Sequence, residues 1–261
     1  MAESVGERVS ALMTQNSSEN CVEARITARI ILSRTLLTAI GLVAWFWTQY
    51  LIGQRPIPLA CIEDRLLALL APAHSFLIEN PQWADALLAA STAIIDGLGV
   101  FILARGIFGS TVRPLLGLFM LFTARQVCQL LVALPLPEGI IWRDPGLPSL
   151  FVTYDVTGDQ FFSGHTALAV YGCIELGRLG RRSFKAAGLM IVAIEMMTVL
   201  VLRAHWFLDV FAAAALAGCA ALLAGRWAPA CDRCLARLLG SGNMAERPWG
   251  RRSKSAGQRD E

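Results

Sequence analysis

The stretch ADALLAASTAIIDGLGVFILARGIF, residues 84–108, decides the fold class of this chain. It is apolar throughout most of its length, and about 20 residues of helix are enough to cross a bilayer. The whole chain has the same character: 55% of its residues are hydrophobic and 16% are charged, whereas about a quarter of the residues in a soluble domain are charged. Its mean hydropathy is +0.53. The composition therefore indicates an integral membrane protein and excludes an ordinary soluble domain.

Six stretches of this kind divide the chain. They are Ile30–Gly53, Ala84–Phe108, Leu115–Leu134, Phe161–Leu179, Ala186–Leu202 and Trp206–Trp227. Because each is close to the length that spans a bilayer, the sequence predicts an all-α, polytopic membrane helix bundle with six transmembrane helices. A further apolar run at residues 66–78 is interrupted by Pro72 and is too short to span. We expect it to form an interfacial or re-entrant piece.

The basic residues predict the direction of insertion. Of the 23 Lys and Arg residues, 18 lie in the N-terminal segment, the second-to-third loop, the fourth-to-fifth loop and the C-terminal tail. An even number of spans puts both termini on one side, and the side rich in Lys and Arg is cytoplasmic. We therefore expect a cytoplasmic segment over residues 1–29, a membrane domain over residues 30–227 and a basic cytoplasmic tail over residues 228–261. The loops at 135–165 and 203–205 are then extracytoplasmic.

One candidate functional motif is Arg203-Ala204-His205-Trp206-Phe207-Leu208-Asp209. His205 and Asp209 are four residues apart, so on a helix their side chains share one face. The carboxylate can then orient the imidazole and stabilise its positive charge. This spacing is typical of a histidine that acts as a nucleophile or a base.

A second motif is Gly158-Asp159-Gln160-Phe161-Phe162-Ser163-Gly164-His165-Thr166. Ser163 precedes a long apolar run, which predicts that it caps a helix N-terminus. The start of a helix offers unpaired N–H groups and a partial positive charge, and both favour phosphate. The predicted topology brings His165 and His205 to the same outer side, because the chain runs inward after the first histidine and returns outward at the second.

Three ionisable residues lie deep within the predicted spans: Asp96, Arg125 and Glu195. Charged groups at such depth are costly and are usually paired or functional. At 1.5 Å of rise per residue, all three lie at similar depths below the outer face, about 14 to 18 Å. We therefore expect an Asp96–Arg125 pair that is structural or lines a pocket, and Glu195 can extend it to a network of three.

Three blocks together resemble the sphingomyelin synthase-like lipid phosphotransferases, a branch of the lipid phosphate phosphatase (PAP2) superfamily. The first is Arg125 followed by the turn Leu134-Pro135-Leu136-Pro137, the second is the segment from Gly158 to Thr166, and the third runs from His205 to Val210. The resemblance covers roughly residues 84–227. The sequence departs from the family pattern at Thr157, at Trp206-Phe207 and in having the single Arg125 in place of an arginine-rich stretch.

The resemblance implies a mechanism. His205, oriented by Asp209, would attack the phosphorus of a phospholipid headgroup and form a phosphohistidine. His165 would protonate the departing lipid oxygen and then deprotonate the hydroxyl of a second lipid, ceramide or diacylglycerol, which takes the headgroup. The expected partners are therefore a phospholipid donor, a lipid alcohol acceptor and the bilayer, with no cofactor, no metal and no nucleic acid.

Substrate and phosphate binding is assigned to a further set of residues around the two histidines. Positive charge for the phosphoryl oxygens would come from the helix start at Ser163 and Gly164 and from Arg125 or Arg203. Asp159 would support the loop that presents Ser163 or contact a headgroup amine.

Several alternatives stay open at the level of sequence. Water as the acceptor would make the protein a lipid phosphate phosphatase or a hydrolase of the phospholipase C type. A metal site built from His165, His205, Asp209 and Asp159 is another possibility, and a non-catalytic scaffold or a transporter is a third. The abundance of alanine, leucine and arginine suggests a bacterial inner membrane, with the site on its extracytoplasmic side.

Overall fold

The computed structural model describes residues 2–54, 62–152, 154 and 161–238. Within these ranges it contains eight α-helices and no β-strand, so the predicted all-α fold is confirmed. The chain divides into two compact units, one formed by residues 34–228 and the other by residues 1–33 with residues 229–261. The helices α1 (Ala2–Gly53) and α8 (Phe207–Leu238) contribute to both units. All the residues of the candidate site described below belong to the unit of residues 34–228.

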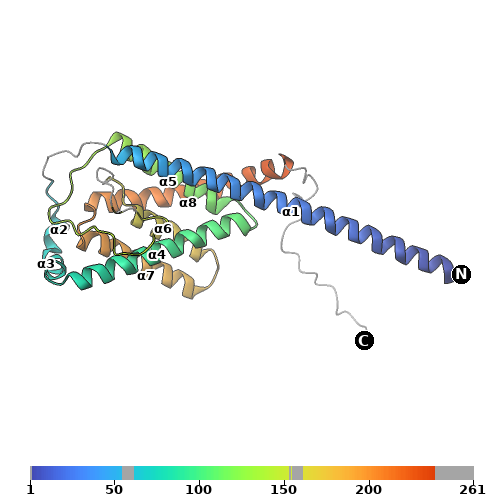
Figure 1. Ribbon diagram of the computed structural model, residues 1–261, viewed down its shortest axis with the longest axis horizontal. Helices are drawn as coiled ribbons and strands as arrows, with labels where there is room; N and C mark the ends of the chain where they lie inside the picture. The colour runs from blue at the N-terminus through green and yellow to red at the C-terminus, as the bar shows by residue number, and fades with distance from the viewer. Residues whose placement is uncertain (1, 55–61, 153, 155–160, 239–261) are drawn as a thin grey trace, which may run out of the picture. The chain divides into compact units, whose positions relative to one another are not determined.

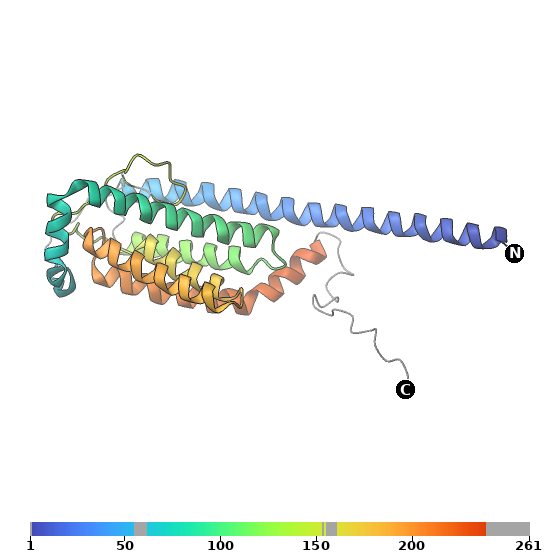
Figure 2. The same cartoon turned by 90° about the horizontal axis from the view of Figure 1, so that it is seen from below.

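Six more helices complete the unit of residues 34–228. They are α2 (Arg65–Leu69), α3 (Ala71–Glu79), α4 (Pro81–Phe108), α5 (Arg113–Leu131), α6 (Gly164–Gly177) and α7 (Arg182–Val201). Figures 1 and 2 show α4, α5, α6, α7 and the first part of α8 running side by side. Between α6 and α7 the chain turns at Gly180, whose φ of 82° favours a residue without a side chain.

Five of the described helices are long and apolar enough to cross a membrane. They contain the segments Thr27–Leu51, Pro81–Phe108, Arg113–Leu131, Arg182–Val201 and Phe207–Leu238. The remaining predicted span, Phe161–Leu179, contains α6, which has 14 residues and is not among these five. The membrane character is therefore confirmed in its coarse form, and the number of six spans stays a prediction.

The short apolar run at residues 66–78 forms the two helices α2 and α3. Pro72 stands in the first turn of α3, where a missing N–H costs nothing, so the proline that interrupts the run also starts a helix. His74 of α3 is buried, and its Nδ1 lies 2.8 Å from the carbonyl oxygen of Val201 at the end of α7. This contact attaches α3 to the C-terminal end of α7.

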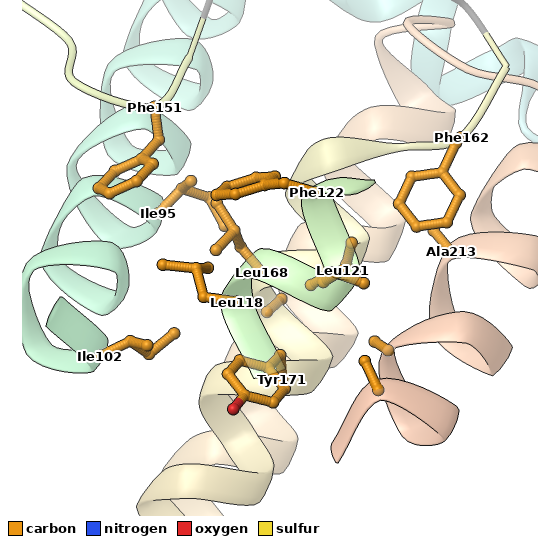
Figure 3. Packing of buried hydrophobic residues seen from close by; sticks show 14 of the residues in the cluster. Ile95, Ile102, Leu118, Leu121, Phe122, Phe151, Phe162, Leu168, Tyr171 and Ala213 are labelled. Carbon is orange, nitrogen blue, oxygen red and sulfur yellow. The ribbon is translucent and has the colours of Figure 1, made fainter. Parts of the chain in front are cut away.

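The core of this unit lies between α4, α5, α6 and α8 (Figure 3). Its largest fully buried side chain is Tyr171 of α6, which donates a hydrogen bond to the carbonyl oxygen of Pro114 at 3.2 Å. The ring fits because position 117 of α5 is a glycine: a methyl group there would overlap Tyr171. At the same end of α6, the buried carboxylate of Glu175 accepts from Arg113 at 3.0 Å and from Arg178 at 2.5 Å. These contacts fix α6 against α5.

The close packing of α5 on α6 gives a stability prediction. Gly117→Ala should lower the free energy of unfolding by about 1–3 kcal/mol, because the added methyl overfills a packed core. Gly97→Ala is the matched control, since a methyl at Gly97 in α4 would meet no atom within 4 Å. Thermal unfolding in detergent micelles should show a lower Tm for the first variant and an unchanged or slightly raised Tm for the second. Equal Tm values for both variants would contradict this packing.

The predicted Asp96–Arg125 pair is wrong. Asp96 accepts hydrogen bonds from the backbone N–H groups of Leu150 and Phe151, at 2.8 and 2.9 Å. Arg125 donates to the side chains of Gln49 in α1 and Gln129 in α5, the second at 3.1 Å.

Glu195 also has a different partner from the expected one. Its carboxylate accepts from the hydroxyl of Ser91 at 2.6 Å, and both residues are buried. The sequence placed the three charges at similar depth, but the depth of a residue does not specify its direction around the helix. The three charged groups therefore bond to loop amides and to uncharged side chains, and not to one another.

Candidate active site

A cavity in the unit of residues 34–228 brings together the two motifs predicted from the sequence. Its lining comes from four helices, the loop between α5 and α6, and the turn between α7 and α8. The lining residues are Trp45, Ile95, Phe122, Arg125, Trp142, Phe151, Val152, Gly164, His165, Leu168, Ala204 and His205. Three of these carry a charge or an imidazole, and most of the others are apolar or aromatic.

His205 lies in the turn that precedes α8, and its neighbour Asp209 lies in the first turn of that helix. The Nδ1 atom of His205 is 3.6 Å from Oδ2 of Asp209, whose side chain is fully buried. The sequence predicted that the two share a helix face. In the structure His205 stands before the first residue of α8, and the carboxylate reaches back toward it. The predicted pairing is confirmed, although its geometry is that of a helix cap.

Asp209 has a second partner that explains this geometry. The same Oδ2 accepts a hydrogen bond from the backbone N–H of Trp206 at 2.9 Å. A carboxylate in the third position of a helix that bonds back to the N-cap amide satisfies one of the orphan donors at that helix end. The other carboxylate oxygen, Oδ1, is buried and has no hydrogen-bond partner among the described residues. Asp209 therefore fixes the start of α8 and faces the imidazole of His205 at the same time.

His165 stands in the first turn of α6. The hydroxyl oxygen of Ser163 accepts from the N–H of Thr166 at 3.3 Å, which confirms the predicted N-cap. The imidazole of His165 is buried in a T-shaped contact with the ring of Trp142, with ring centroids 5.1 Å apart and an interplanar angle of 84°. Its Nε2 has no hydrogen-bond partner within the described ranges. The ring is thus held by packing and retains a nitrogen for a ligand.

The two motifs contact each other directly through the backbone. The N–H of Ser163 donates to the carbonyl oxygen of Asp209 at 3.5 Å. Shortly before each histidine stands a residue other than glycine with positive φ, Phe162 at 83° and Arg203 at 51°. Such backbone is costly and persists only where the surrounding structure holds it, and it is frequent at functional sites. Phe162 is fully buried, which holds its conformation in place.

The two candidate arginines have different positions. Arg125 is buried and lines the cavity, and a Cβ at Gly164 would lie 3.5 Å from its Nε atom. Its guanidinium is therefore beside the start of α6. Arg203 does not contribute to the cavity lining, and its Nη1 donates to the carbonyl oxygen of Glu138 at 2.8 Å. Asp159, the remaining predicted binding residue, lies outside the described residues.

The turn that carries His205 is tied to the loop after α5. The indole Nε1 of Trp206 donates to the carbonyl oxygen of Pro135 at 2.8 Å. The N–H of Ile141 donates to the carbonyl oxygen of Leu202 at 2.9 Å. The first of these bonds joins the Leu134-Pro135-Leu136-Pro137 block to the His205 block, and the second joins the same loop to the end of α7.

The start of α8 is held from a second direction by Asp64. One carboxylate oxygen of this residue accepts from the N–H groups of Leu66 and Leu67 at 3.0 and 3.2 Å, and so caps α2. The other oxygen accepts from the N–H of Phe207 at 2.7 Å. At the start of α8 the N–H of Trp206 therefore donates to Asp209 and the N–H of Phe207 donates to Asp64.

Sequence reasoning missed the aromatic part of the cavity. Trp45 of α1 stacks on Phe122 of α5, with centroids 4.7 Å apart and an interplanar angle of 18°. The ring of Phe151 lies beside both of these rings, 6.4 Å from Phe122 at 16° and 6.3 Å from Trp45 at 33°. One signal was present: Gln49, a polar residue in an apolar span, is four residues from Trp45 and so shares its face of α1.

Trp142 contacts a second aromatic residue, Tyr154, with ring centroids 5.0 Å apart. The hydroxyl of Tyr154 pairs with Thr92 of α4. Burial raises the pKa of this phenol above its ordinary value, so Tyr154 stays neutral near pH 7.

The arrangement provides three chemical functions in one cavity. His205 is an imidazole backed by a buried carboxylate, His165 is a second imidazole with an available nitrogen, and Arg125 is a fixed cation. These are the groups required for nucleophilic attack, proton transfer and anion binding. Across the part of the chain that the structure describes, no three His, Cys, Asp or Glu side chains are grouped as metal ligands.

Comparison with known proteins gives one result. The AtPDCT1/2 family model matches residues 64–226, more than half of the chain. No curated protein and no solved structure matches. The match begins at Asp64, which caps α2, and includes both histidine motifs.

Proposed function

The chain belongs to the AtPDCT1/2 family, and we propose that it is an integral membrane lipid phosphotransferase. It moves a phospho-headgroup from a phospholipid to a lipid alcohol, ceramide or diacylglycerol. One observation carries the proposal: two histidines 40 residues apart line one cavity, and one of them faces a buried aspartate. The resemblance to the sphingomyelin synthase-like phosphotransferases points to the same chemistry.

In the first step His205 is the nucleophile. Its Nδ1 faces Asp209, so its Nε2 is the nitrogen that attacks phosphorus. The P–N bond forms as the P–O bond to the diacylglycerol part of the donor breaks, and the departing oxygen takes a proton from the imidazolium of His165. The carboxylate of Asp209 stabilises the positive charge that develops on the His205 ring.

In the second step His165, now neutral, acts as a base. It removes the proton from the hydroxyl of the acceptor lipid, and the oxygen attacks the phosphorus of the phosphohistidine. The new P–O bond forms as the P–N bond breaks, and His205 returns to its neutral state. One residue thus acts first as acid and then as base, as covalent catalysis in two steps requires.

The negative charge of the phosphoryl group is best accommodated at the start of α6. Gly164 and His165, the first two residues of this helix, both line the cavity, and Arg125 lies beside them. A helix start and a fixed guanidinium stabilise an anion together. The start of α8 is a poorer phosphate site, because Asp64 and Asp209 already occupy its first amides.

The cavity lining favours a lipid acceptor over water. Apart from Arg125, His165 and His205, the lining side chains are apolar or aromatic. A site with few polar groups holds few ordered waters, and this protects a reactive phosphohistidine from hydrolysis. A phosphatase or a hydrolase of the phospholipase C type is the second candidate, and it would use the same two histidines.

A labelled phospholipid distinguishes these candidates. Purified protein is given phosphatidylcholine, phosphatidylethanolamine or phosphatidylinositol, each with a ³²P-labelled headgroup, with and without ceramide or a diacylglycerol whose acyl chains differ from those of the donor. We expect label to move to a lipid product only when the acceptor is present, and little label to enter the aqueous phase. Release of label to water at the same rate with and without acceptor would identify a hydrolase. No movement of label in any mixture would favour a scaffold or a transporter.

We further propose six transmembrane helices with both termini in the cytoplasm, and a site that faces the extracytoplasmic side of the membrane, the inner membrane in a bacterium. The concentration of Lys and Arg near the termini supports this orientation. A tag placed after Glu261 should be protected from protease in intact cells and cleaved after permeabilisation. A tag inserted after Leu136, in the loop between α5 and α6, should show the opposite. A C-terminal tag that is accessible only from outside would overturn the orientation.

A further inference from the structure

A non-helical segment of the loop between α5 and α6 reaches the middle of α4. The contact is made at Asp96, which lies 15 residues after Pro81, the first residue of α4. At 1.5 Å of rise per residue this is about 22 Å along the helix. Backbone that is not helical has unpaired amides, and at such depth in a membrane these must be satisfied within the protein.

The side chain of Asp96 provides hydrogen-bond acceptors for these loop amides. Its Oδ2 accepts from the N–H of Leu150 at 2.8 Å, and its Oδ1 accepts from the N–H of Phe151 at 2.9 Å. The next amide, that of Val152, donates to the hydroxyl oxygen of Ser149 at 2.8 Å. Three successive amides of the loop therefore have partners, and two of them depend on a single carboxylate.

The same face of α4 also seats the ring of Phe151. Gly99 is three residues after Asp96, and a Cβ at this glycine would overlap the Phe151 ring. Phe151 is 7% exposed, and Figure 3 shows its ring beside Ile95 of α4 and Phe122 of α5. Phe151, Val152 and Ile95 all line the cavity that contains the two histidines.

We infer that Asp96 is a positioning residue that anchors this loop and thereby holds Phe151 and Val152 as one wall of the substrate cavity. The two hydrogen bonds from the loop amides to Asp96 fix the position of the loop along the axis of α4. Gly99 leaves the space that the Phe151 ring occupies. The effect on substrate binding rests on the proposed phosphotransferase function. The anchor itself does not depend on that function.

Hydrogen–deuterium exchange of the purified protein tests the anchor without any activity. In Asp96→Asn the carboxamide can accept only one of the two N–H bonds, so the amides of Leu150 and Phe151 should exchange at least tenfold faster. Asp85→Asn is the matched control. Asp85 also ties α4 to this loop, through Arg143 at 2.7 Å, but it is half exposed and does not line the cavity. Unchanged exchange in Asp96→Asn, or equal acceleration in both variants, would overturn the anchor.

Kinetics test the consequence for the cavity. In Asp96→Asn the KM for the phospholipid donor should rise about tenfold while kcat stays within threefold, since the histidines are untouched. Asp85→Asn should keep both constants. Because Asp96 acts through Phe151, the double variant Asp96→Asn/Phe151→Leu should be no worse than the more severe single variant. Additive losses would show that Asp96 acts by another route and would contradict the inference.

A second variant keeps the test valid if Asp96→Asn does not fold. Gly99→Ala leaves the carboxylate in place and pushes the Phe151 ring from its seat, so it should raise the KM for the donor in the same way. A folded Gly99→Ala protein with the wild-type KM would contradict the role of Phe151 and Val152 in binding the donor. If the wild-type protein transfers no headgroup, the proposed function fails, and the exchange measurement still decides whether Asp96 anchors the loop.

Discussion

His205→Ala is expected to abolish headgroup transfer, with a loss on the order of 10⁴-fold or more, because the variant has no nucleophile to form the covalent intermediate. Two readouts apply. The initial rate of transfer from a ³²P-labelled donor should fall to background. Wild-type protein quenched in the absence of acceptor should carry acid-labile, base-stable label, as a phosphohistidine does, and the variant should carry none.

Asp209→Asn provides a graded comparison with His205→Ala. The carboxamide oxygen can still accept the Trp206 amide, so the start of α8 is retained, but the charge facing Nδ1 of His205 is lost. We expect a partial loss of rate with a detectable covalent intermediate. If a folded and inserted His205→Ala protein transfers the headgroup at the wild-type rate, the phosphohistidine mechanism is wrong.

His165→Asn is expected to lower kcat by about 10²–10⁴-fold, the usual contribution of a general acid–base group. Both steps should slow, because His165 donates a proton in the first and removes one in the second. The packing of position 165 against Trp142 makes Asn a suitable replacement, since it is polar and smaller than the imidazole that it replaces.

A donor that needs no acid separates the two histidines. The 4-nitrophenyl ester of the same phospho-headgroup has a leaving group that departs without protonation. His165→Asn should release 4-nitrophenolate from this donor in a burst and accumulate the covalent intermediate, because only the second step still needs the base. His205→Ala should show no burst. Equal behaviour of the two variants with the activated donor would contradict the assigned roles.

Much of the site could be predicted because its chemistry is local in sequence. Ser163 is an N-cap wherever a helix follows it, and Asp209 is close enough in the chain to reach His205 in either a helix or a cap. The alternation of apolar stretches predicted that His165 and His205 lie at the same end of the bundle, and in the structure both line one cavity. These predictions needed only short-range geometry and the order of the spans.

The predictions that differ from the structure concern two features: the direction in which a side chain points around its helix axis, and the course of backbone that is not helical. Asp96 and Arg125 were paired because their depths agree, yet Asp96 binds loop amides and Arg125 binds Gln49 and Gln129. Composition gives no signal that a loop will reach the middle of a helix. The expected span Phe161–Leu179 is shortened for a related reason, since Phe162 has a φ of 83° and α6 begins only at Gly164.

The contribution of α1 to the cavity lay beyond the three motifs used for the resemblance. Trp45 and Gln49 are on one face of the apolar part of α1, and only long-range packing shows that this face meets Phe122 and Arg125. A sequence pattern can show that a helix is apolar all round. It does not identify which face has a neighbour.

The bonds that hold the His205 turn have a consequence for how this protein can diversify. The hydrogen bonds that fix this turn are accepted by backbone carbonyl oxygens, those of Pro135, Glu138 and Leu202. Every amino acid has such an oxygen. Substitutions in the loop after α5 can therefore alter the side chains near the cavity without removing the acceptors that fix the nucleophile. Under the proposed function, the fold would therefore keep the geometry of the two histidines separate from the side chains of the loop after α5 that face the lipid substrate.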